Sequence, residues 1–125
     1  MVSKALAQDT KDYAWTAKSV AKSIRWLPPE RIRHYACLTY EGDVYSFAMT
    51  ALECITRQRP FAEFDDDDEI RRLYKHILDN GRPERPKTKL MSDRLWHVIK
   101  QCWAAYQKDR PSMHSVVSNL GLLMF

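Results

Sequence analysis

The segment from Val44 to Arg57 constrains this 125-residue chain most, because it is apolar on nearly every side. Few polar residues interrupt it before Arg57: Ser46, Thr50, Glu53 and Thr56. A helix without a wide polar face must be covered on several sides. Asp43, which follows Gly42, is expected to open this helix. We therefore predict a mainly α fold in which other helices pack around a buried central helix over about residues 43–57.

Two shorter segments also have helical signals. Proline suits the first turn of a helix, so a short helix is predicted from Pro29 to about Tyr35. Apolar residues recur every three or four positions from Ile70 to Asn80, which indicates an amphipathic helix with Gly81 as its stop. Both helices would pack an apolar side against the central one.

The last third of the chain contains two further helical patterns. Ser92 can cap a helix that is expected to bury Trp96 and Trp103. A final helix should follow residues 109–112 and use four apolar positions, which are Met113, Val116, Val117 and Leu120. No internal repeat emerges, so the chain reads as one helical unit preceded by an irregular segment.

The run from Asp65 to Glu69 directly precedes the predicted helix at Ile70. Carboxylates before and within a first turn interact favourably with the helix dipole, which favours a solvated helix start. A docking surface for a basic partner is the alternative. Consecutive aspartates without turn glycines lack the spacing of a calcium loop, so we expect no metal site there.

Charge and cysteine content exclude several classes of protein. Residues 1–34 hold seven Lys/Arg against three Asp/Glu, and residues 35–125 hold thirteen of each, so the net charge of +4 belongs to the N-terminal segment. A nucleic-acid-binding domain would instead cluster cations on the element that meets phosphate. The three cysteines are widely spaced, which argues against a disulfide framework or a zinc site. We expect neither nucleic acid nor a membrane as a partner.

Five short motifs stand out along the chain: Arg25-Trp26-Leu27-Pro28-Pro29-Glu30, Gly42-Asp43-Val44-Tyr45-Ser46-Phe47-Ala48, Arg59-Pro60-Phe61, Cys102-Trp103 and Asp109-Arg110-Pro111-Ser112-Met113. In this order and spacing they resemble a protein kinase C-terminal lobe, with the tyrosine kinase and tyrosine-kinase-like branches most similar. The match covers essentially the whole chain, and the first twenty or so residues are the least constrained. The resemblance implies an activation-segment-like loop over 1–30 and a helical C-lobe subdomain over 31–125. It also implies structural roles for Asp43 and Trp103 and an ion pair between Glu30 and Arg110.

The resemblance further singles out residues in the N-terminal segment. Hydroxyls at Thr10, Tyr13, Thr16 and Ser19 are candidates for regulatory phosphorylation, with a plain exposed loop as the alternative. Ser23, Arg25 and Trp26 stand in a substrate-loop-like position. Because tyrosine kinases tend to carry proline where this chain has Ser23, Ser/Thr specificity of the parent kinase is slightly favoured.

Phosphoryl transfer needs groups that these 125 residues lack. It requires a glycine-rich phosphate cover, a strand lysine, a His-Arg-Asp catalytic loop and the metal-binding Asp-Phe-Gly. The glycines are Gly42, Gly81 and Gly121, each about forty residues from the next, and neither His-Arg-Asp nor Asp-Phe-Gly occurs. We expect a truncated kinase fragment with no catalytic residue and no cofactor of its own, although complete kinases use ATP and magnesium.

Three functions remain open. The first is a fragment of an ATP-dependent protein kinase that cannot transfer phosphate alone. The second is a noncatalytic, pseudokinase-like interaction module, and the third is a phosphotransferase completed by another chain. The expected partners are a protein or the protein substrate of the parent kinase, together with self-association through exposed apolar surface. The expected location is the cytoplasm, with the nucleus as the alternative.

Overall fold

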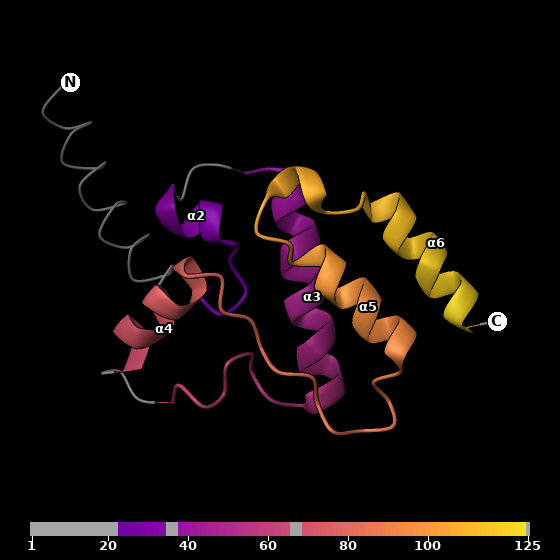
Figure 1. Cartoon of the computed structure of the whole chain (residues 1–125), viewed down its shortest axis with the longest axis horizontal. Helices are drawn as coiled ribbons and strands as arrows, with labels where there is room; N and C mark the ends of the chain where they lie inside the picture. Colours follow the sequence, from indigo (N-terminus) through magenta and orange to yellow (C-terminus); the bar gives the residue numbers. More distant parts are fainter. Residues whose placement is uncertain (1–22, 35–37, 66–68, 125) are drawn as a thin grey trace, which may run out of the picture.

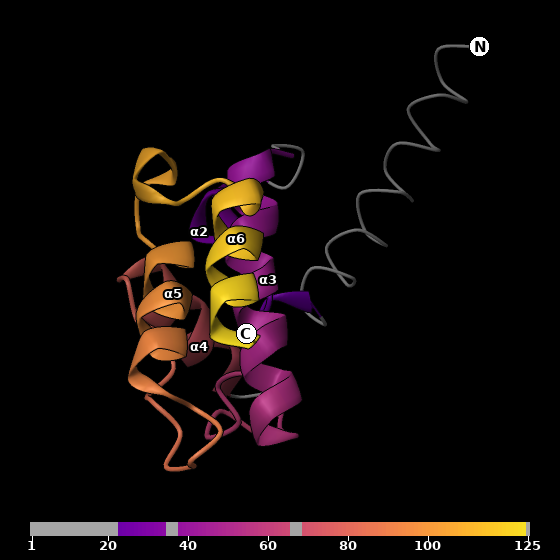
Figure 2. The ribbon, with the colours of Figure 1, turned by 90° about the vertical axis from the view of Figure 1, so that its right-hand side faces the viewer.

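The computed structural model describes residues 23–34, 38–65 and 69–124, and no strand occurs within them. The elements, in chain order, are α2 (Pro29–Arg33), α3 (Tyr40–Thr56), α4 (Ile70–Leu78), α5 (Asp93–Cys102), the 3-10 turn η2 (Gln107–Asp109) and α6 (Met113–Met124). Helix α5 packs against both α3 and α6, and η2 also contacts α3 (Figure 1). Turning the molecule brings α6 to the front with α3 and α5 behind it (Figure 2). The predicted mainly α fold is confirmed.

Helix α3 begins at Tyr40, three residues before the predicted start at Asp43. The side chain of Thr39 caps it by accepting a hydrogen bond from the Gly42 amide at 3.0 Å. Gly42 lies within the helix. A Cβ there would stand in tight contact, 3.2 Å, with Thr39 Oγ1 and in ordinary contact, 3.5 Å, with Pro28 Cγ. The glycine therefore leaves room for the capping hydroxyl of Thr39 instead of marking a helix boundary.

The central helix buries one broad face and not its whole circumference. Its fully buried side chains include Val44, Tyr45, Ala48, Met49 and Leu52. Thr50 and Cys54 are exposed, whereas Phe47 and Ile55 are half-buried. The expectation that the helix is covered on several sides is therefore confirmed, while the strip that holds Thr50 and Cys54 stays exposed.

Helix α5 begins at its predicted cap, since Ser92 Oγ accepts the Leu95 amide at 3.1 Å. Trp103 is buried, but Trp96 is only half-buried, so the prediction of two buried tryptophans holds for one of them. The two rings meet edge to face, with centroids 5.3 Å apart. In α6, Val116 is buried while Val117 is 59% exposed, contrary to its predicted core position.

Helix α4 ends at Leu78, and Asn80, with φ 68°, takes the left-handed conformation that terminates it. Gly81, the predicted stop, does not have a positive φ. A Cβ at Gly81 would stand 2.3 Å from Nε2 of His76, so the glycine makes room for that ring. The acidic run is described in part only: Asp65 pairs with Arg59, and 66–68 lie outside the described residues.

The segment before α2 belongs to the helical body. Ile24 and Leu27 are buried with the core of α3 and α5, and α2 ends at Arg33, before the predicted Tyr35. The last part of the predicted activation-segment-like loop therefore packs on the helices that follow it. No helix in the described ranges is long and apolar enough to cross a membrane.

Candidate functional site

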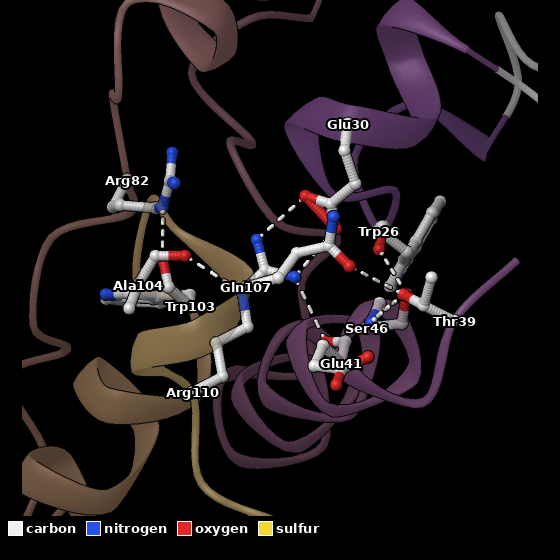
Figure 3. A network of polar contacts seen from close by, with 11 residues as sticks. Trp26, Glu30, Thr39, Glu41, Ser46, Arg82, Trp103, Ala104, Gln107 and Arg110 are labelled. Atoms are coloured by element: carbon white, nitrogen blue, oxygen red, sulfur yellow. Dashed lines mark hydrogen bonds and ion pairs between the residues drawn. The ribbon is translucent and has the colours of Figure 1, made fainter. Parts of the chain in front are cut away.

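The end of the N-terminal segment is tied to the loop before α6 by a buried ion pair (Figure 3). Arg110 Nη1 donates to Glu30 Oε2 at 2.7 Å, and Nη2 donates to Glu30 Oε1 at 2.8 Å. The arginine side chain is fully buried, and that of Glu30 is 16% exposed. The pair expected from the resemblance is therefore present, in the bidentate geometry that makes arginine–carboxylate contacts strong.

Arg110 also donates hydrogen bonds to backbone carbonyl oxygens in two other parts of the chain. Its Nε donates to the carbonyl oxygen of Ala104 at 2.9 Å, and Nη1 donates to that of Glu41 at 3.1 Å. Glu41 lies in the first turn of α3. One guanidinium thus fixes α2, the start of α3 and the loop after α5 relative to one another.

A second arginine, Arg82, also lies against the ring of Tyr45. The guanidinium carbons of Arg82 and Arg110 lie 5.1 and 5.2 Å from the Tyr45 ring centroid, within cation–π range. Arg82 Nε donates to the carbonyl oxygen of Trp103 at 3.0 Å (Figure 3). Burial lowers the pKa of Arg82 and raises that of Tyr45 to about 12. The Tyr45 hydroxyl has no hydrogen-bond partner in the described part of the chain.

Sequence reasoning missed this role of Arg82 because it lies in the basic, proline-punctuated stretch 82–89. Charged residues between prolines usually indicate a solvated loop. The signal that could have found it is Tyr45 on the core face of α3, because the face of a buried aromatic ring is a favourable place for a guanidinium.

Arg25 is buried and binds three backbone carbonyl oxygens. Its Nη1 donates to the carbonyl oxygens of Pro60 at 3.0 Å and Phe61 at 2.6 Å, and Nη2 donates to that of Phe64. Desolvation, followed by the nearby charge of Arg59, lowers the pKa of Arg25. The substrate-loop-like position is therefore held against the Arg59-Pro60-Phe61 motif through backbone acceptors.

Trp26 is held by α3. Its Nε1 donates to Glu53 Oε1 at 3.1 Å, and its carbonyl oxygen accepts from Ser46 Oγ at 2.7 Å (Figure 3). Ser23, the remaining member of the substrate-loop-like group, is exposed. The structure thus brings Arg25 and Trp26 into the helical body and leaves the Ser23 hydroxyl at its surface.

Asp43 is exposed beside two adjoining surface hollows. One, of about 530 Å³, is lined by Asp43 with Leu38, Tyr40 and their neighbours. The other, of about 440 Å³, is shared by Tyr40 and Met113 across α3 and α6. Leu38 and Tyr40 are 72% and 89% exposed, so this end of the molecule carries uncovered apolar surface.

The remaining candidates lie elsewhere. Thr10, Tyr13, Thr16 and Ser19 fall outside the described residues. Within the described ranges, no group of three or more His, Cys, Asp or Glu side chains could hold a metal ion.

A helical body around α3, tied to the end of a preceding segment by a buried arginine–glutamate pair, has the features of a kinase C-terminal lobe. The sequence profile of the family described as "Protein tyrosine and serine/threonine kinase" matches residues 2–120. The chain belongs to this family.

Similar relatives include proteins named as tyrosine kinases and proteins named as serine/threonine kinases. The chain is 30% identical over 112 residues, or 89% of its length, to "Putative neurotrophin receptor LTRK 1" of Lymnaea stagnalis. It is 31% identical over 99 residues (78%) to "Inactive tyrosine-protein kinase 7" of Gallus gallus. It is 32% identical over 102 residues (77%) to "Receptor-interacting serine/threonine-protein kinase 4" of Mus musculus. The matches span 13%, 9% and 12% of these relatives, respectively.

Proposed function

We propose that these 125 residues form the substrate-side scaffold of a protein kinase catalytic domain and transfer no phosphate by themselves. The observation that carries this proposal is the pair of clamps at Arg110 and Arg25. The first ties Glu30, at the end of the activation-segment-like region, to α3, and the second holds the substrate-loop-like residues against Pro60 and Phe61. Both clamps position a peptide-binding segment, and neither performs chemistry.

The groups that handle nucleotide would come from other residues. The 125 residues contain no glycine-rich loop, His-Arg-Asp or Asp-Phe-Gly, and phosphoryl transfer depends on positioning such groups around ATP and magnesium. We propose that this chain has no cofactor of its own and that a complete domain would supply the ATP site.

The exposed surface around Asp43 is where we expect the missing catalytic loop to dock. In the family, the aspartate at this position holds the backbone of the catalytic loop. Here Asp43 stands beside two hollows lined by Leu38, Tyr40 and Met113. A catalytic-loop segment docked there would cover apolar surface that is otherwise in contact with water.

The proposal is tested with purified chain, Mg-ATP carrying labelled γ-phosphate and generic protein substrates. No transfer above a blank should occur for the chain alone. Transfer that co-purifies with the chain and persists after a contaminant control would overturn the proposal. The open reading frame upstream of Met1 gives an independent test, since it should encode His-Arg-Asp and Asp-Phe-Gly.

Specificity and location are finer parts of the same proposal. The exposed Ser23 hydroxyl stands where tyrosine kinases tend to carry proline, which favours Ser/Thr specificity of the parent kinase. We place the protein in the cytoplasm, with the nucleus as the alternative. Peptide arrays phosphorylated by the complete kinase, and a tagged full-length chain in cells, would test these points.

A noncatalytic interaction module is the second candidate. It is favoured by the similarity to a relative whose name describes it as inactive. The surface that we assign to it consists of the acidic run 65–69, of which Asp65 is engaged by Arg59, with Tyr74 and His76. A specific partner that is captured by the chain, and lost when residues 65–68 are changed to serine, would support this function over the first.

A further inference from the structure

Among the tyrosines that the structure describes, Tyr106 alone combines high exposure with an extended backbone outside a helix. Its side chain is 69% exposed, and its φ of −97° and ψ of 132° fall in the extended region. It lies between the end of α5 at Cys102 and the start of η2 at Gln107. In Figure 1 this loop passes the start of α3 on its way from α5 to α6. The phenol therefore stands at the surface of a short connecting loop.

Few contacts hold the Tyr106 side chain in place. Its hydroxyl makes no hydrogen bond within the described ranges, and the contact recorded for its ring is the Lys108 ammonium, 5.9 Å from the ring centroid. The amides of Ala105 and Tyr106 donate no backbone hydrogen bond in that part of the chain either. Two small residues, Ala104 and Ala105, precede the tyrosine. An enzyme can therefore engage this phenol without first opening a helix.

The other described tyrosines are less suited to reaction at the hydroxyl. Tyr45 is fully buried, and Tyr40, although 89% exposed, is the first residue of α3. Tyr74 lies within α4, and its hydroxyl donates to the carbonyl oxygen of Ile32 at 3.2 Å. Phosphoryl transfer requires the acceptor oxygen in line with the γ-phosphate of ATP. A tyrosine held in a helix must first be released by local opening, which costs free energy.

We propose that Tyr106 is a phosphorylation site for a tyrosine kinase supplied by another protein, with ATP as the phosphoryl donor. The phenolic oxygen attacks the γ-phosphorus of ATP and forms an O–P bond, while the bond from that phosphorus to the bridging oxygen breaks. The phenolic proton passes to a basic group of the acting kinase, and ADP leaves. The product carries a charge of about −1.5 to −2 at neutral pH. The Lys108 cation, which now faces the ring, can then pair with the phosphate oxygens.

This inference goes beyond the proposed scaffold function, because the phosphate is transferred by an added kinase. The 125-residue chain is incubated with Mg-ATP and the catalytic domain of a broad-specificity tyrosine kinase, and site-resolved mass spectrometry follows each tyrosine. A reaction without the added kinase measures the scaffold function separately. Synthetic peptides spanning 36–44, 70–78 and 102–110 give the rate at Tyr40, Tyr74 and Tyr106, respectively, in the absence of the fold.

The ratio of the rate in the chain to the rate in the peptide isolates the effect of the structure from sequence preference. Tyr106 should react in the chain within about threefold of its peptide, because its segment needs no helix opening. Tyr40 and Tyr74 should react at least about tenfold more slowly in the chain than in their peptides, because α3 and α4 must open locally.

Two phenylalanine variants complete the experiment. Tyr106→Phe should abolish phosphate on 102–110, and its melting temperature should match that of the native chain because the side chain is exposed. The matched control, Tyr40→Phe, removes another exposed hydroxyl and should leave the rate at Tyr106 within about twofold. Absence of phosphate on Tyr106 in the folded chain, equal slowing of Tyr106 and Tyr40 relative to their peptides, or helical tyrosines that react as fast in the chain as in their peptides would each overturn the proposal.

Discussion

Arg110 holds the carboxylate of Glu30 through two parallel hydrogen bonds of 2.7 and 2.8 Å, although eighty positions separate the two residues. The same guanidinium reaches the carbonyl oxygens of Glu41 and Ala104. A single buried cation therefore joins α2, α3 and the loop before α6. Its partner, Glu30, lies in the first turn of α2.

Removing one member of this pair should destabilise the chain strongly. Glu30→Ala or Arg110→Ala leaves the other charge buried and uncompensated, and each should lower the free energy of unfolding by about 3–5 kcal/mol. Urea denaturation measures the change. The double variant should lose less than the sum of the single losses, because no unpaired charge then remains.

The exposed pair of Arg85 and Asp93, 2.7 Å apart, is the matched control. Asp93→Asn should cost less than about 1 kcal/mol, since water solvates the charge that remains. Melting temperatures of Glu30→Ala and Arg110→Ala equal to that of the native chain would contradict the structural role of the pair.

Removing the Arg25 side chain should also lower the free energy of unfolding. Arg25→Ala removes the donor for three carbonyl oxygens around Phe61, and we expect a loss of about 2–4 kcal/mol because charged hydrogen bonds and buried acceptors are both affected. Arg25→Lys should recover only part of it, since an ammonium lacks the planar fork of the guanidinium. Arg94→Ala, at an exposed position of α5, serves as the control in the same denaturation series. An equal loss in the free energy of unfolding for Arg25→Ala and Arg94→Ala would contradict this structural role of Arg25.

Tyr45 should make stability fall at alkaline pH. Burial raises its pKa from 10.0 to about 12, so the unfolded chain releases this proton at a lower pH than the folded one. The stabilising contribution is full below pH about 10 and is lost as pH rises through about 12. Tyr45→Phe removes a hydroxyl that lacks a partner in the described residues, and it should change stability at neutral pH by less than about 1 kcal/mol.

The measurement compares denaturation of the native chain, Tyr45→Phe and Tyr106→Phe from neutral to alkaline pH. Tyr45→Phe should retain roughly 2–3 kcal/mol more of its neutral-pH stability than the native chain, which corresponds to the difference between the two pKa values. Tyr106 is 69% exposed, so its variant should follow the native curve. Identical alkaline losses in all three proteins would exclude Tyr45 as the source.

The helices could be predicted from the sequence because their signals are local. The apolar face of α3, the Ser92 cap of α5 and the three-and-four spacing of α4 each lie within one element. The start of α3 at Tyr40 could not be predicted, because a glycine such as Gly42 next to a helical segment usually indicates a helix boundary. Only the packed fold reveals that Gly42 lies against Pro28.

The candidate site was predictable only where family resemblance paired distant residues, as for Glu30 and Arg110. Arg25 and Arg82 bind backbone carbonyls of Pro60, Phe61 and Trp103. A carbonyl acceptor exists at every residue, so no side-chain pattern in the sequence identifies it. The exposure of Val117 has a related cause, because helical spacing indicates an apolar face but not which neighbours cover it.

Gly81 should tolerate a side chain only when His76 is removed. A Cβ at residue 81 would meet the His76 ring at 2.3 Å, and that ring packs against Phe61 and Phe64 with centroids 5.8 and 5.4 Å away. Gly81→Ala should therefore cost about 1–3 kcal/mol through overpacking. In a His76→Ala background the same change should cost much less, and thermal melts of the four proteins form the cycle.

Gly121→Ala is the control for this cycle, since nothing lies within 4 Å of a Cβ there. It should be neutral or should stabilise α6 by about 0.5–1 kcal/mol, as alanine does in a helix interior. An equal cost of Gly81→Ala with and without the His76 ring would show that the steric explanation is wrong.

The apolar surface around Asp43 should drive self-association of the isolated chain. Leu38, Tyr40 and Met113 are 72%, 89% and 41% exposed and line two hollows that share Tyr40, and exposed apolar surface of this kind favours association. Sedimentation velocity should show the average mass rising with concentration. Leu38→Ser combined with Met113→Ser should shift the chain toward monomer, whereas Leu90→Ser, at a 70% exposed position in the loop before α5, should not. A native chain that stays monomeric at all concentrations, or an equal effect of Leu90→Ser, would exclude this surface, because association would then be absent or nonspecific.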